Sequence, residues 1–137
     1  MPRLDDCHEQ IVHALEKDGW RVNPSQEQRY TPDRTIFIDI VATRGINGST
    51  EQILLAEIKC FADRNATARE LYIAFGQYIL YRALLDELKD EAPLYLAVPE
   101  HAYLNIFGQT VRRAVRDNRV KMVIVNVVTE TITQWIE

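Results

Sequence analysis

The sequence predicts an α/β (α+β) domain in which helices flank a central mixed β-sheet. Short apolar runs typical of buried strands alternate with longer segments of helical periodicity, without internal repeats or low-complexity tracts. A predicted helix precedes the apolar strand at 94–98, and such a crossover usually joins parallel strands. The length of 137 residues and the apolar fraction of 47% suit one domain with a real core, spanning 1–137.

The chain is expected to begin with a helix over residues 5–18. Four residues recur with helical spacing and would share one face of this helix: His8, Ile11, Val12 and Leu15. Asp6 followed by Glu9 resembles a capped start, and Gly19 is placed to end the helix.

Three strands are expected next, at 20–23, 35–43 and 52–61, with a polar loop at 24–34. The dipeptide Asn47-Gly48 is favoured in hairpins, so the second and third strands should pair antiparallel. That pairing would place Asp39 beside the strand that carries Glu57 and Lys59.

A longer helix is predicted from Thr67 to about Lys89, with Thr67 and Glu70 forming a capping box at its start. Gly76 in its middle costs about 1 kcal/mol relative to alanine, which close packing against the sheet would explain. The remaining elements are a strand at 94–98, a helical segment at 99–118 broken near Gly108, and strands at 121–127 and 131–136.

Composition and charge restrict the possible functions. The net charge of −4 argues against broad, charge-driven adhesion to nucleic acid. A local basic cluster is either a nucleic-acid contact or a solvated helix face, and it consists of Arg112, Arg113, Arg116, Arg119 and Lys121.

Two cysteines, Cys7 and Cys60, cannot make a disulfide framework, and neither lies in a Cys-x-x-Cys pair, which disfavours structural zinc. The sequence has no apolar run of transmembrane length and starts without the apolar core of a signal peptide. We therefore expect a cytoplasmic protein without a membrane partner.

Three charged residues stand in apolar strands: Asp39, Glu57 and Lys59. A buried, unpaired carboxylate costs several kcal/mol, so each acid needs a partner. Glu57 and Lys59 point to the same face because strand side chains alternate. The two acids could hold Mg²⁺ or Mn²⁺ and polarise a phosphoryl oxygen, while Lys59 stabilises negative charge. An Asp39–Lys59 salt bridge would also give Asp39 a partner. The spacing of the residues does not distinguish a metal site from such a salt bridge.

Asp39 followed by Glu57-Ile58-Lys59 resembles the PD-(D/E)xK motif of restriction-endonuclease-like nucleases, although Ile38 replaces the usual proline. On the following helix, Gln77 and Tyr81 match the Gln-x-x-x-Tyr pattern of RecB-type nucleases. Residues four apart share a helix face. Both side chains could therefore reach the site or DNA; the alternative is a packed tyrosine and a surface glutamine.

Archaeal Holliday-junction resolvases with this fold carry a glutamate on the first helix, and the matching position here is His8. A histidine with a pKa near neutrality could replace that acid as a metal ligand or a proton-transfer group. A partly buried structural histidine is the alternative.

Short motifs spread along nearly the whole chain resemble the XisH family, the fdxN element excision controlling factors typical of cyanobacteria. They are His8–Leu15, Glu16–Trp20, Ala56–Lys59, Phe75–Tyr78, Leu94–Pro99 and Gln134-Trp135. The resemblance implies a restriction-endonuclease-like fold and a role in site-specific excision of a DNA element. It also implies a site-specific recombinase and a small XisI-like companion as partners.

Two readings of that role stay open. In the first, the protein is a metal-dependent DNA endonuclease in which Asp39, Glu57, Lys59 and Gln77 act. In the second, it is a non-catalytic accessory factor that binds DNA, the recombinase or the companion. The valine-rich strand at 121–127 and the edge strand at 131–136 could support a homodimer.

Overall fold

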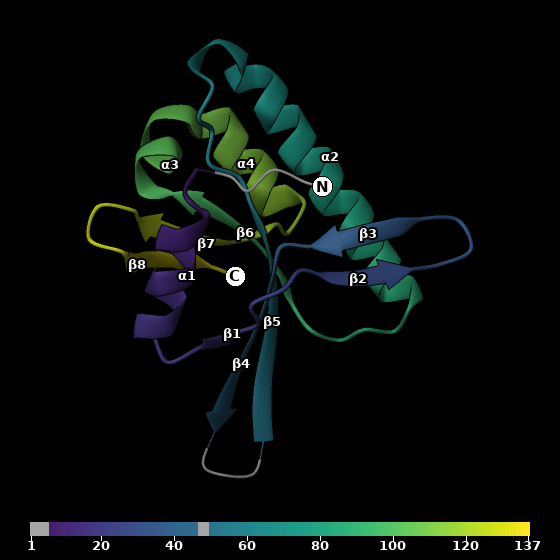
Figure 1. The fold of residues 1–137 in the computed structure, drawn as a ribbon. Helices are drawn as coiled ribbons and strands as arrows, with labels where there is room; N and C mark the ends of the chain where they lie inside the picture. Colours follow the sequence, from purple (N-terminus) through teal and green to yellow (C-terminus); the bar gives the residue numbers. More distant parts are fainter. Residues whose placement is uncertain (1–5, 47–49) are drawn as a thin grey trace.

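A computed structural model of the chain describes residues 6–46 and 50–137. Its elements, in chain order, are α1 (His8–Lys17), β1 (Arg21–Val22), β2 (Glu27–Tyr30), β3 (Thr35–Ile38), β4 (Ile40–Ile46), β5 (Thr50–Ile58), the 3-10 turn η1 (Arg64–Ala66), α2 (Thr67–Glu87), β6 (Leu94–Pro99), α3 (Glu100–Ile106), α4 (Gln109–Asp117), β7 (Lys121–Asn126) and β8 (Thr131–Ile136). Figure 1 shows their arrangement.

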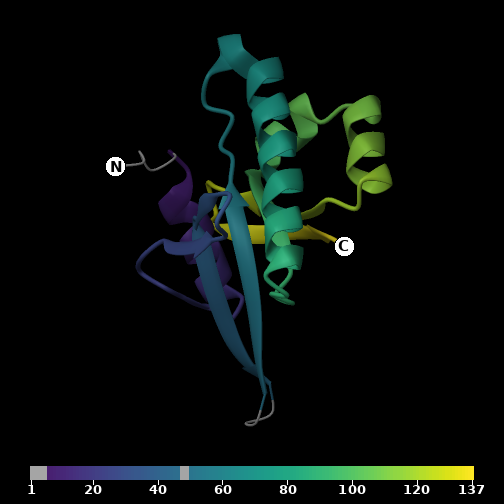
Figure 2. The same cartoon turned by 90° about the vertical axis from the view of Figure 1, so that its right-hand side faces the viewer.

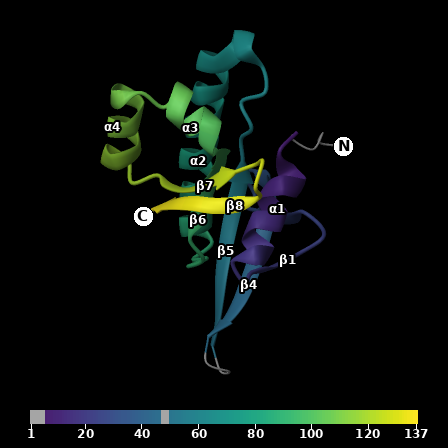
Figure 3. The ribbon, with the colours of Figure 1, turned by 90° about the vertical axis from the view of Figure 1, so that its left-hand side faces the viewer.

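The main sheet is mixed, with the strand order β1-β4-β5-β6-β7-β8. Strands β4 and β5 pair antiparallel, β5, β6 and β7 are parallel, and β8 returns antiparallel to β7. Helix α2 makes the crossover before β6, and α3 and α4 make the one before β7. Helix α1 lies on one side of the sheet and α2, α3 and α4 on the other (Figures 2 and 3). The expected fold class, a mixed sheet flanked by helices, is confirmed.

Side chains of β5 alternate between two cores, one on each side of the sheet. Leu54, Ala56 and Ile58 pack in the core on the α1 side, together with Cys60. Leu55 packs in the core on the α2 side. Because strand side chains alternate, Glu57 projects toward α2. The predicted division of this strand into two faces is therefore confirmed.

The predicted strand at 35–43 is wrong in one respect, because the chain bends at Asp39. Residues before the bend, in β3, pair with β2, and residues after it, in β4, pair with β1 and β5. Strand β2 lies in the segment that the sequence predicted as a loop. Its residues are polar and sit on a two-stranded hairpin, so they lack the apolar alternation that identifies a half-buried strand.

Helix α2 begins without the predicted capping box. The turn η1 precedes α2. The N-cap of α2 is Ala66, and no side chain caps the first amides of this helix. The Thr67 hydroxyl instead donates to the Arg64 carbonyl at 3.3 Å. The explanation for Gly76 is also wrong, because a Cβ placed there would meet no heavy atom within 4 Å outside the helix's own backbone. Gly76 is exposed and does not pack on the sheet.

The predicted cap at Asp6 is also wrong, because the N-cap of α1 is Cys7 and no side chain caps its first amides. The following expectations are met. The helical segment after β6 is broken at Gly108 as predicted, and β8 forms an edge of the main sheet. The antiparallel pairing of β4 with β5 is confirmed, although the Asn47-Gly48 turn lies outside the described residues. Cys7 and Cys60 form one disulfide, which the exclusion of a disulfide framework had not foreseen. Across the described ranges, every helix is too short or too polar to span a membrane.

Candidate functional site

The site forms where the β4–β5 ladder ends. The last backbone pair of this ladder joins Ile40 to Ala56, and the next two residues, Asp39 and Glu57, bond through their side chains. The Asp39 Oδ2 atom accepts the backbone N–H of Ile58 at 2.9 Å, and the Glu57 Oε1 atom accepts the backbone N–H of Asp39 at 3.1 Å. These two bonds hold both carboxyl groups at the end of the ladder, where the chain leaves the main sheet for β3.

Glu57 is the one charged side chain classed as buried among the described residues, with 3% of its surface exposed. The pKa of Glu57 is raised to about 9. Burial is the main cause, and the negative charge of Asp39 is the second. The positive charge of Lys59 opposes the shift, but only weakly. Without a cation, Glu57 is therefore protonated at neutral pH.

Lys59 follows β5 directly and is half-buried. Its backbone N–H donates to the Ala97 carbonyl at 3.0 Å, which continues the parallel ladder with β6 by one residue. Within the described ranges, Lys59 makes no ion pair with Asp39 or Glu57. The alternative of a structural Asp39–Lys59 salt bridge is therefore wrong, and the lysine head group is left beside the acids.

Helix α2 brings Gln77 and Tyr81 toward this point. The Gln77 Nε2 atom donates to the Tyr81 hydroxyl oxygen at 3.0 Å, whereas the buried Gln77 Oε1 atom has no partner. Burial raises the pKa of Tyr81, and the charges of Glu57 and Asp39 raise it further. That electrostatic effect requires the phenol to lie near both acids.

Two neighbours of the site were missed by the sequence analysis. The Gln26 Nε2 atom donates to the Asp39 Oδ1 atom at 3.0 Å, and the charge of Arg34 lowers the pKa of Tyr81. Gln26 and Arg34 stand at the two ends of the β2–β3 hairpin, in the segment predicted as a loop. A polar segment of this kind carries no pattern that points to a distant carboxylate.

The donor atoms suit a hard divalent cation that keeps most of its water. Asp39 and Glu57 supply carboxylate oxygens, and Gln77 supplies a buried amide oxygen without a partner. Magnesium is usually bound by one or two carboxylates and several waters. In the described part of the chain, no three His, Cys, Asp or Glu side chains are grouped to hold a metal. His8 opens α1 on the far side of the sheet and does not complete such a group with the two acids.

The basic residues that the sequence offers as a nucleic-acid contact, in the second half of the chain, have different roles in the structure. Arg112 supports the fold, because its Nε atom donates to the Phe107 carbonyl at 2.7 Å and its guanidinium stacks over Tyr103 at 4.2 Å. Arg113 pairs with Asp117 on the same helix at 3.6 Å. Arg116 is exposed on α4. Of this cluster, Arg113, Arg116 and Arg119 are exposed and stay candidate contacts for nucleic acid, whereas Lys121 is half-buried beside Tyr95.

Together, the fold and the site define a mixed α/β protein with a pair of acids at the end of a central strand. A family model described as XisH protein matches residues 1–133, so the chain belongs to the XisH family. No curated protein matches it.

Two solved structures resemble the chain over nearly its whole length. A fdxN element excision controlling factor protein from Anabaena variabilis is 31% identical, with a TM-score of 0.84, and the match covers 97% of this chain and 100% of that one. An XisH family protein from Nostoc punctiforme PCC 73102 is 34% identical, with a TM-score of 0.81 and coverage of 97% and 100%.

Proposed function

We propose that this member of the XisH family is a controlling factor for site-specific excision of a DNA element and acts as a metal-dependent endonuclease. The Anabaena variabilis neighbour, itself called a fdxN element excision controlling factor, supports the first part. The contact between the buried Glu57 and Asp39 supports the second. Beside the half-buried Asp39, a buried Glu57 is ionised at neutral pH only if a cation compensates the two charges.

Asp39 and Glu57 would hold Mg²⁺ or Mn²⁺, and Gln77 would bind a metal-bound water through its unpartnered Oε1 atom. When bound by Asp39 and Glu57, such a cation would supply Lewis acidity and would lower the pKa of a bound water. The ammonium group of Lys59 stabilises the negative charge that develops on a phosphoryl oxygen.

Tyr81 assists through its hydroxyl hydrogen. Its oxygen accepts a hydrogen bond from Gln77, which leaves the hydrogen available to donate to a DNA phosphate. Since the pKa of Tyr81 is raised above its usual value, this hydrogen is retained at neutral pH. Tyr81 therefore positions a phosphate rather than acting as a base.

A nicking assay tests the endonuclease. Supercoiled plasmid is incubated with the purified protein and Mn²⁺ or Mg²⁺, and the nicked fraction is measured over time. We expect Asp39→Asn and Lys59→Met each to lower the rate about 100-fold or more. Glu16→Gln, which removes an exposed acid of α1, is the matched control and should nick at the wild-type rate. Equal nicking by Asp39→Asn, or none by the wild type with either metal, would refute the proposal.

A second candidate is a non-catalytic accessory factor that binds a XisI-like companion, a site-specific recombinase or DNA. The net charge of −4 and the small number of acids at the site favour it. Co-expression with the companion should then give one complex on size exclusion, and Asp39→Asn should leave that complex intact. Separate elution at micromolar concentration would count against this candidate.

A further inference from the structure

Helix α2 carries apolar side chains on the face that points away from the sheet. Four of its large apolar residues are exposed: Tyr72 (76%), Ile73 (49%), Ile79 (38%) and Leu80 (52%). Figure 2 shows this face of the 21-residue helix running along the outside of the molecule. A helix that is apolar on both faces usually buries both, and a contiguous exposed apolar patch marks an interaction surface.

The outward residues of α2 follow a coiled-coil spacing. Six exposed positions, separated alternately by three and four residues, form a straight line that we call the α2 seam. They are Arg69, Tyr72, Gly76, Ile79, Ala83 and Asp86. Alternation of three and four is the spacing by which one helix meets another along a shared seam.

We propose that the α2 seam binds the α2 seam of a second copy of this chain, with the two helices antiparallel. A two-fold axis beside the middle of the helix then makes the contact isologous, so that each pair of residues occurs twice. In the resulting register, Tyr72 faces Ala83 of the second copy and Ile79 faces Gly76. At both ends of the seam, Arg69 faces Asp86.

The sizes of the facing side chains are complementary in this register. Each large residue, Tyr72 or Ile79, meets a small one, Ala83 or Gly76. A Cβ at Gly76 would meet no heavy atom of the chain's own fold within 4 Å. The hollow in front of it, which Ala114 and the C-cap Asn118 of α4 line on the far side, leaves room for a side chain of the second copy. A glycine in an exposed helix interior costs about 1 kcal/mol relative to alanine. The need for this room in the dimer would explain Gly76.

The charges select both the orientation and the occupant. Neither Arg69 nor Asp86 takes part in an ion pair within the described chain. An antiparallel second copy supplies the opposite charge to each, whereas parallel helices would place Arg69 against Arg69 and Tyr72 against Tyr72. The seam is complementary to itself in both size and charge, which favours a second copy over an unrelated helix.

The first test is the molar mass of the full chain by sedimentation equilibrium, from about 1 to about 100 µM, the range expected of a modest interface. We expect the wild type to shift from monomer to dimer over this range. Gly76→Gln should remain monomeric throughout because its side chain fills the seam. Its thermal midpoint at low concentration should not fall, because glutamine is the better helix former and a Cβ at this position meets no heavy atom of its own chain within 4 Å.

Charge exchange provides the second test and does not rely on filling the seam. Arg69→Glu or Asp86→Arg alone should weaken dimerisation about tenfold, because each variant places like charges together at both ends of the seam. The double variant should recover an affinity within about threefold of the wild type. A wild type that stays monomeric at every concentration, or a double variant as weak as the singles, would overturn the proposal. Nicking is measured separately, so failure of either proposal leaves the other intact.

Discussion

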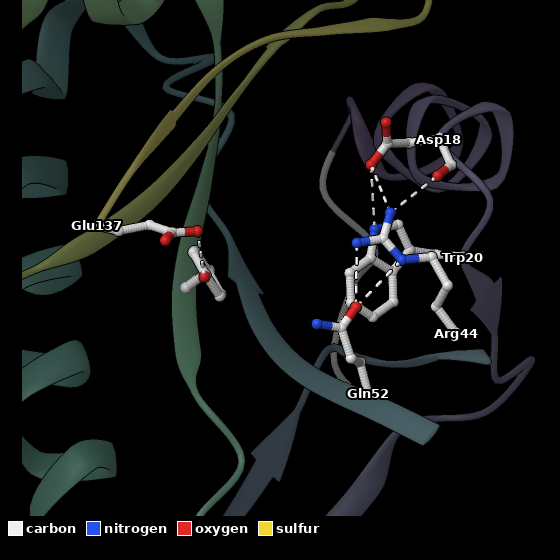
Figure 4. A network of polar contacts seen from close by, with 6 residues as sticks. Asp18, Trp20, Arg44, Gln52 and Glu137 are labelled. Carbon is white, nitrogen blue, oxygen red and sulfur yellow. Dashed lines mark hydrogen bonds and ion pairs between the residues drawn. The ribbon is translucent and has the colours of Figure 1, made fainter. Parts of the chain in front are cut away.

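Two groups of charged side chains on the main sheet differ in how their charges are compensated. The first is the acidic site of Asp39, Glu57 and Lys59. The second, the Arg44 network, joins Arg44 to Asp18 and Gln52 by the contacts drawn in Figure 4, where Trp20 bonds Asp18. Its position is at the α1 side of the sheet, close to the surface, whereas Glu57 is buried.

In the Arg44 network, each charge has a partner. The Arg44 Nη1 atom donates to the Asp18 carbonyl at 3.2 Å, and its Nη2 atom donates to the Gln52 Oε1 atom at 3.1 Å. The guanidinium also lies 4.3 Å from the centre of the Trp20 ring, whose Nε1 atom donates to Asp18. These contacts are complete within the chain and need no ligand.

The acidic site is the opposite case, since it places two acids together and bonds neither to a cation. Burial first, and then the charge of Asp39, raise the pKa of Glu57 there. The comparison teaches that charge count alone does not identify a functional cluster. A cluster whose charges are paired within the chain stabilises the fold, whereas a cluster whose charges lack partners is suited to bind a ligand.

The largest expected effect that separates the two groups is the response of stability to pH. The pKa of Glu57 is about 9 in the folded chain and ordinarily 4.5. Between these values the unfolded chain has released a proton that the folded chain keeps, so wild-type stability should fall as pH rises from about 5 to about 9. Glu57→Gln should remove this fall and be more stable than the wild type at pH 8, on the order of 2 kcal/mol.

Urea denaturation at pH 5 and pH 8, without divalent cations, measures this difference. Arg44→Met is the control, because its loss of stability should be similar at both pH values. A wild type whose stability does not change between pH 5 and pH 8 would contradict the raised pKa.

The next effect in size is stabilisation by a divalent cation. A cation that binds only the folded chain raises stability by about 1.4 kcal/mol at tenfold excess over its Kd. We expect Mg²⁺ or Mn²⁺ at pH 8 to raise the Tm of the wild type and of Arg44→Met. Asp39→Asn should show no such rise, and an equal rise in all three proteins would place the cation elsewhere.

The smallest effect is expected from the Arg44 network itself. Arg44→Met removes a half-exposed cation–π contact and several hydrogen bonds, which should cost about 1 kcal/mol. Arg44→Lys should recover only part of this loss, since an ammonium cannot bond Asp18 and Gln52 as a planar fork does. Denaturation midpoints of the three proteins test the ranking; a loss of several kcal/mol would show that the network is more than a surface feature.

Local periodicity accounts for the parts of this molecule that the sequence predicted correctly. The side of the sheet that Glu57 faces follows from the alternation of β5, and the proximity of Gln77 to Tyr81 follows from helical spacing. The bend at Asp39 was missed because it is accompanied by a long-range hydrogen bond from Ile58, which no local pattern encodes. The Cys7–Cys60 pair was missed for the same reason, as its partners are 53 residues apart.

Helix α2 was predicted correctly as a helix, but Gly76 on it was misread for a different reason. Because apolar residues lie around most of its circumference, its pattern does not say which face meets the sheet. Gly76 was therefore assigned to the buried face, although the structure puts it on the outside. A helix of this composition needs the neighbouring elements before its faces can be assigned.

The position of β5 between an antiparallel and a parallel neighbour also bears on the order of folding. Its pairing with β4 closes over a short stretch of chain, whereas its pairing with β6 requires the whole α2 crossover to be in place. Short loops close at lower entropic cost and therefore earlier. We therefore expect Asp39 and Glu57 to meet first, before the crossover docks and brings Tyr81 toward them.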